Sequence, residues 1–115
     1  MSIEDVNKID MIGIPNNNEN LVILGLTDHL SWSGSLENHL LKLQEKINSY
    51  IRFIESGELY KSFPASSGKS EILIEIYFKY TIPQECIHFL EKVRELLTTV
   101  NIQLKYEKGN IIETQ

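Results

Sequence analysis

The sequence is poor in cysteine, in positive charge and in long apolar runs. Cys86 is its only cysteine, which excludes an intramolecular disulfide and any zinc site with two or more thiolates from one chain. Sixteen acidic residues against eleven basic ones give a formal charge of −5, whereas a nucleic-acid-binding protein needs a basic face. No run approaches the ~18 apolar residues of a membrane span, and "MSIEDVNKID" lacks the apolar core of a secretory signal. We therefore expect a cytoplasmic protein that binds neither nucleic acid nor membranes.

The length and composition are those of one ordinary globular domain. The chain has 115 residues, of which 42% are hydrophobic and 23% charged, with three prolines and six glycines. A chain of this length buries roughly two-thirds of its unfolded surface and needs no disulfide or metal to fold. We predict a single domain over residues 1–115, with an ordered core at about 9–107 and a polar tail at each end.

Two β-rich runs, "IDMIGIP" and "LVILGLT", flank the turn-forming segment "NNNEN". They predict a hairpin whose strands cover residues 9–14 and 21–27. Both strands carry apolar residues on both sides, which is typical of strands that are covered on both faces.

Apolar residues recur every three or four positions from Leu36 to Ile54, which predicts a long amphipathic helix over residues 35–56. Ser35 is the predicted N-cap, with Ser33 as the alternative, and Gly57 is expected to end the helix. The polar residues between the apolar ones are expected to face solvent: Lys42, Glu45, Lys46, Ser49 and Arg52.

The second half of the chain predicts a strand, a helix and a strand. After a loop in "ELYKSFPASSGK", the run "SEILIEIYFKY" alternates strictly, which indicates a half-buried strand of the antiparallel type. Pro83, at or near the first helical position, opens a helix over 83–98 with Cys86 on its apolar stripe. A last strand is expected over 101–107.

The predicted element order is ββαβαβ. It favours an α+β fold, a two-layer sandwich in which two helices cover one face of a four-stranded sheet. The order of the strands stays open. The uncovered face is expected to be half apolar, which favours self-association through this open sheet face.

The segment "TDHLSWSGSLENHL", residues 27–40, concentrates groups that bind metals or transfer protons. Glu37 and His39 lie about 200° apart on the helix and cannot hold one ion together, and the spacings of zinc-binding helices are missing. The first interpretation is structural: Asp28 bonds loop amides, His29 donates to the loop and Trp32 covers the helix start. The alternative is a ligand-binding site formed by Asp28, His29, Trp32 and His39.

Three other patterns are weaker evidence for a functional site. "SSGKS" ends like a phosphate-binding loop, but Phe63 stands where the Walker pattern needs glycine, and a strand follows it. Cys86 is expected to be a buried, inert thiol, since His88 lies elsewhere around the helix. Glu71 and Glu75 share a strand face at ~13 Å, too far apart for a closely coupled carboxylate pair. We predict no catalytic residue, metal ion or cofactor.

The runs "LTDHLSW", "HLLKLQEKINSYIRFIESGELY", "IEIYFKY" and "FLEKVRELL" resemble a small bacterial family classified as a domain of unknown function. The resemblance covers about residues 9–107. It rests on an Asp-His-Leu-x-Trp loop, on a Gln-x-Lys-x-Asn helix at Gln44, Lys46 and Asn48, and on Glu55-Ser56-Gly57. It implies a bacterial cytoplasmic protein and no particular activity.

The features together favour a non-enzymatic protein–protein interaction domain. Self-association is one form of this function. An inhibitor-type role, in which the acidic surface covers a basic partner protein, is another. The alternative from a different class is a small-molecule, metal-binding or hydrolytic site around the Asp28-His29-Trp32 loop and His39.

Overall fold

The computed structural model describes residues 3–107 and residue 109. The predicted α+β class and ββαβαβ order are confirmed, with two short helical segments added where the sequence predicts a loop. The elements are β1 (Met11–Gly13), β2 (Leu21–Asp28), α1 (Leu36–Glu55), α2 (Glu58–Ser62), η1 (Pro64–Ser66), β3 (Glu71–Phe78), α3 (Gln84–Thr98) and β4 (Ile102–Glu107).

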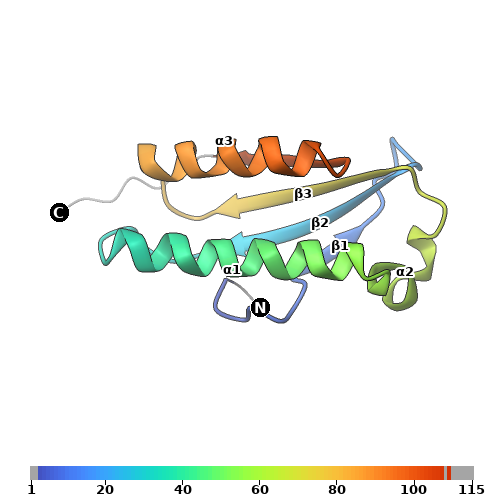
Figure 1. The fold of residues 1–115 in the computed structure, drawn as a ribbon, viewed down its shortest axis with the longest axis horizontal. Coiled ribbons are helices and arrows are strands. Elements are labelled where there is room, and N and C mark those ends of the chain that lie inside the picture. Colours follow the sequence, from blue (N-terminus) through green and yellow to red (C-terminus); the bar gives the residue numbers. More distant parts are fainter. Residues whose placement is uncertain (1–2, 108, 110–115) are drawn as a thin grey trace.

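The four strands form one mixed sheet in the order β1-β2-β3-β4 (Figure 1). β1 pairs antiparallel with β2, as the predicted hairpin requires, whereas β2–β3 and β3–β4 are parallel pairs. The antiparallel character predicted for the strand at 71–80 is therefore wrong. Its alternation of apolar and polar residues reflects burial of one face only, and this can occur in either strand direction when helices cover a single side.

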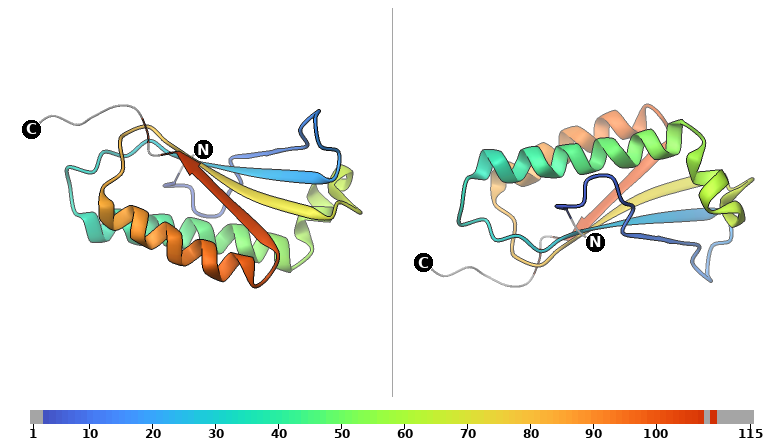
Figure 2. Two further views of the ribbon diagram at one scale, coloured as in Figure 1. Left: turned by 90° about the horizontal axis from the view of Figure 1, so that it is seen from above. Right: turned by 90° about the horizontal axis from the view of Figure 1, so that it is seen from below.

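Both views of Figure 2 show α1 and α3 on the same side of the sheet. Between the helices and the strands lies the core, to which every second residue of the three longer strands contributes. Its buried strand residues are Val22, Leu24, Leu26, Ile74, Ile76, Phe78, Ile102 and Leu104. The intervening residues lie on the opposite, open face of the sheet.

The ends of α1 follow the predicted chemistry. The Ser35 side chain accepts a hydrogen bond from the Asn38 backbone N–H at 3.2 Å, which caps the helix start. Gly57 follows the last turn with φ +81°, a left-handed conformation that costs glycine little. Pro83 is the residue before Gln84, the first residue of α3, which agrees with its predicted place at or near the start of this helix.

Residues 3–8 are held against the domain, whereas the sequence predicts a polar tail over residues 1–8, of which residues 1 and 2 lie outside the described residues. Ile3 is buried in the core, and its backbone N–H donates to the Thr27 carbonyl at 3.0 Å. Apart from Gly109, the C-terminal tail predicted after residue 107 lies outside the described residues. No helix within residues 3–107 has the length and apolar character that crossing a membrane requires.

Candidate functional site

The predicted site lies where the parallel strands β2 and β3 end. Asp28 is the last residue of β2 and stands beside Phe78, the last residue of β3. Each of these strands leads into one of the long helices, so their carboxyl ends and the first turns of α1 and α3 gather at one end of the molecule (Figure 1). In sheets with parallel strands, functional side chains commonly lie at this end.

Asp28 and His39 form a buried pair across this end of the sheet. The Asp28 Oδ2 and His39 Nε2 atoms are 2.6 Å apart, and the two residues are only 1% and 5% exposed. The other carboxylate oxygen of Asp28 accepts the Leu30 backbone N–H at 3.0 Å. Nδ1 is the other nitrogen of the His39 ring. Nδ1 is buried and has no hydrogen-bond partner among the described residues.

Trp32 covers this pair from the loop before α1. Its ring stacks on the His39 imidazole with centroids 3.5 Å apart and planes inclined by 13°. On the β3 side, its centroid is 6.3 Å from that of Phe78. The prediction that Trp32 covers the helix start therefore holds, and the stack fixes the imidazole from one face.

Cys86 is a neighbour that sequence reasoning did not connect with the site. The thiol is fully buried, as predicted, and burial together with the negative charge of Asp28 raises the pKa of Cys86 to about 12. The thiolate is therefore negligible at neutral pH, and the residue is inert. The order of elements along the chain points to this contact, because Cys86 lies in the first turn of the helix that follows β3.

His29, the fourth predicted residue, is exposed, whereas Asp28 and His39 are buried. Its side chain is exposed and belongs to a shallow hollow of about 250 Å³ together with Thr27, Asp28, Tyr77, Phe78 and Lys79. Within the described part of the chain, no three histidine, cysteine or acidic side chains are placed to hold a metal ion. The structure thus joins Asp28, Trp32 and His39 into one cluster, called here the aspartate–histidine cluster.

A second buried polar cluster surrounds Lys46, which the sequence predicts to face solvent. That prediction is wrong, because Lys46 is fully buried. Its ammonium donates to the carbonyls of Asp5 at 2.5 Å and Lys8 at 2.6 Å, and to the Asp10 carboxylate at 3.1 Å. These acceptors use all three N–H groups, so the buried charge is paired and fully hydrogen-bonded.

Tyr50, one turn further along α1, completes this second cluster. Its hydroxyl donates to the Gly25 carbonyl at 2.6 Å and accepts the Asp10 backbone N–H at 2.8 Å. Burial is the main reason why the pKa of Tyr50 is raised. Residues Lys46, Asp10 and Tyr50, called here the lysine clamp, tie the N-terminal segment to α1 and β2.

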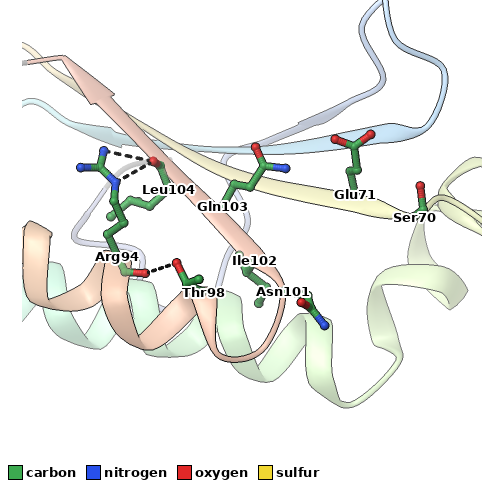
Figure 3. Close-up of a pocket in the computed structure, with 8 residues that line it drawn as sticks. All are labelled: Ser70, Glu71, Arg94, Thr98, Asn101, Ile102, Gln103 and Leu104. Atoms are coloured by element: carbon green, nitrogen blue, oxygen red, sulfur yellow. Dashed lines mark hydrogen bonds between the residues drawn. The ribbon is translucent and has the colours of Figure 1, made fainter.

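A hollow of about 510 Å³ lies where β3 and β4 begin, and Figure 3 shows its lining residues. Its one cation, Arg94, is engaged: Nε and Nη2 donate to the Leu104 carbonyl at 3.4 and 3.2 Å, and Nη1 pairs with Glu91. The Tyr106 hydroxyl donates to the same Glu91 carboxylate at 2.5 Å. These contacts fasten α3 to the edge strand β4, which is a structural role.

The comparison with family models decides the classification. The model described as "Family of unknown function (DUF6572)" matches residues 1–110. The chain belongs to this family. No curated protein and no solved structure matches it. Membership in the DUF6572 family agrees with the resemblance to a family of unknown function stated from the sequence and brings no activity with it.

Proposed function

We propose that this DUF6572 protein is a protein–protein interaction domain that self-associates through the open face of a two-layer α+β sandwich. The observation that carries the proposal is an apolar row across three strands of that face. Met11 of β1 and Tyr77 of β3 are 46% and 42% exposed, and both side chains lie over Gly25 of β2.

Gly25 brings the two side chains together. A Cβ at this position would stand 2.7 Å from Met11 Cε and 3.3 Å from the Tyr77 ring, so a larger residue would push them apart. Beside the row lies a hollow of about 390 Å³. The hollow is lined almost entirely by apolar residues: Met11, Ile12, Gly13, Ile14, Pro15, Ile23, Gly25 and Tyr77. An exposed apolar surface of this kind is typical of an interface.

Charge favours a second copy as the occupant. The whole chain carries −5, so most of its surfaces repel a copy of themselves. Next to the apolar row, however, the Lys105 ammonium lies 3.5 Å from the Glu75 carboxylate, and this pair has no net charge. A two-fold contact through the row therefore buries apolar surface beside this neutral pair, and Glu107, the register partner of Tyr77, adds one negative charge at its edge.

Sedimentation tests the proposal. The wild-type protein is expected to form a concentration-dependent dimer, and Tyr77→Lys is expected to be monomeric because it places a charge in the row. Leu41→Lys is the matched control, since Leu41 is 52% exposed on α1, away from this face. A wild-type protein that stays monomeric at high concentration contradicts self-association. A monomer that forms a stable complex with a basic protein would instead support the inhibitor-type role.

The aspartate–histidine cluster is a second candidate, for a ligand-binding or hydrolytic site. The observation in its favour is the buried pair of Asp28 and His39, in which the carboxylate orients the imidazole as in proton-transferring sites. Metal analysis of the purified protein tests its metal-binding form. Stoichiometric metal that disappears in His39→Ala and persists in His29→Ala supports the site, and a metal-free wild-type protein rules that form out.

A further inference from the structure

Met11 places a sulfur atom in the apolar row of the open sheet face. Its Cβ and Cε atoms lie 3.2 and 2.7 Å from where a Cβ on Gly25 would stand, so the side chain is folded over the glycine. The residue is 46% exposed, which leaves nearly half of its surface open to solvent. Exposed methionine is a common target of oxidation, which converts the apolar thioether into a polar sulfoxide.

Among the described residues, the sulfur of Met11 is the accessible one. The other sulfur is that of Cys86, which is fully buried. Burial, together with the negative charge of Asp28, raises the pKa of Cys86 to about 12, so the thiolate that peroxides attack is negligible at neutral pH. Met1, the second methionine of the chain, lies outside the described residues.

The surroundings of Met11 suit a thioether and not a sulfoxide once the face is covered. The lining of the adjoining hollow offers one side-chain donor, the Tyr77 hydroxyl, and this hydroxyl already donates to the Glu75 carboxylate. On the free face, water donates to a sulfoxide oxygen, but a contact that excludes water leaves this oxygen unpaired. Oxidation of Met11 therefore penalises a dimer formed through this face and leaves the monomer almost unaffected.

We propose that Met11 is a peroxide-sensitive switch of self-association, whose oxidation converts the dimer to a monomer. The inference rests on the sheet-face dimer of the proposed function. In the reaction, the O–O bond of hydrogen peroxide breaks, one oxygen forms an S–O bond with the Met11 sulfur, and the other oxygen leaves as water. The sulfur loses two electrons and the peroxide gains them. Because the dimer covers the sulfur, the monomer in equilibrium with it is the species that reacts.

Peroxide treatment of the purified protein tests the inference. Peptide mass spectrometry identifies one added oxygen at Met11, and sedimentation measures the dimer before and after treatment. Oxidation is expected to raise the dissociation constant of the dimer about tenfold or more, because it places an unpaired polar group inside the interface. Treatment with methionine sulfoxide reductases and a thiol reductant should restore the dimer, since this modification is reversible.

Two variants assign the effect to Met11. Met11→Leu keeps an apolar side chain of similar volume, so it should dimerise as the wild type does and no longer respond to peroxide. It retains Met1 and Cys86, which makes it the control for oxidation elsewhere in the chain. Met11→Gln carries a polar group where oxidation would create one, and it should be monomeric without peroxide.

Two results would overturn this inference alone. They are a dimer that persists after complete oxidation of Met11, and an equal loss of dimer when Met11→Leu is treated. If Met11→Leu is unfolded by circular dichroism, a folded Met11→Gln protein that dimerises as tightly as the wild type also overturns the inference. An untreated wild-type protein that stays monomeric at high concentration contradicts the proposed function and this inference together.

Discussion

The two buried polar clusters differ in how completely their groups are hydrogen-bonded. In the lysine clamp, each N–H of Lys46 has an acceptor, and the Asp10 carboxylate also accepts from the Thr27 backbone and hydroxyl at 3.0 and 3.2 Å. In the aspartate–histidine cluster, Asp28 is similarly engaged, but Nδ1 of His39 has no partner among the described residues.

The lysine clamp is therefore purely structural, whereas the aspartate–histidine cluster retains a ring nitrogen that no described residue uses. A satisfied ammonium has nothing left to offer a ligand, and its role is to hold residues 3–10 on the domain. A buried ring nitrogen without a partner is costly, and such groups deserve a functional explanation. Asp28 and His39 are therefore the residues to test for function, and Lys46 is the residue to test for stability.

The largest effect is expected from Lys46→Met. It leaves the buried Asp10 carboxylate without its cation and releases the Asp5 and Lys8 carbonyls, so it should lower the free energy of unfolding by about 3–5 kcal/mol. Urea unfolding measures the change. Lys42→Met, on the exposed side of the same helix, should shift it by less than about 0.5 kcal/mol, and equal effects would mean that the clamp is not stabilising.

Asp28→Ala is expected to cost about 2–3 kcal/mol, because it leaves the Leu30 N–H and the Nε2 atom of His39 unpaired in a buried setting. His29→Ala is the adjacent exposed control and should be nearly neutral. A double-mutant cycle with His39→Ala measures the coupling of the pair. Strict additivity of the two substitutions would show that the 2.6 Å contact contributes nothing to stability.

Tyr50→Phe removes one hydroxyl from the clamp and nothing else. The Gly25 carbonyl and the Asp10 N–H each lose a partner, so a loss of about 1–2 kcal/mol is expected in chemical denaturation. Tyr60→Phe, at an exposed tyrosine, is the matched control. If both changes are neutral, water replaces the hydroxyl and the clamp depends on Lys46 alone.

The smallest effect, over the range from pH 8 to 10, is a loss of stability in alkali. The pKa of Cys86 is raised from its ordinary value of 9.0 to about 12, so above pH 9 the unfolded chain releases a proton that the folded chain retains. The stability from this group is complete below pH 9, falls by about 1 kcal/mol between pH 9 and 10, and then falls by about 1.4 kcal/mol per pH unit up to about pH 12. Tyr50 acts in the same direction from pH 10, since burial raises its pKa as well.

Thermal unfolding between pH 8 and 10 checks this prediction. Cys86→Ala is expected to flatten the decline between pH 9 and 10, where Tyr50 does not yet contribute. An unchanged decline in that variant would show that the thiol is not the group responsible.

Sequence periodicity was a good guide wherever one side of an element is buried. The ends and capping of α1, the extent of α3 and the inward residues of β3 follow from spacings of three, four or two residues. Lys46 shows where this fails. It stands three residues after Leu43 and four before Tyr50, on the buried side of the helix, and was assigned to solvent only because lysine is polar.

The candidate site, too, was predicted from the sequence only in part. Its four residues were found as chemical types within one short segment, but the sequence contained nothing to distinguish His39, which is buried, from His29, which is exposed. The distinction depends on the end of β2 meeting the second turn of α1. The contribution of Cys86 depends further on β3 lying beside β2.

The sequence by itself determined the four strands, the two long helices and their order, because these follow from local propensity and from the periods of helix and strand. The tertiary structure alone decided that three strands run parallel, that a lysine is enclosed by residues 5, 8 and 10, and that an aspartate bonds a histidine beneath a tryptophan. Each of these depends on bringing distant segments together, and the cost of burying a polar group is offset only when its partner arrives from elsewhere in the chain.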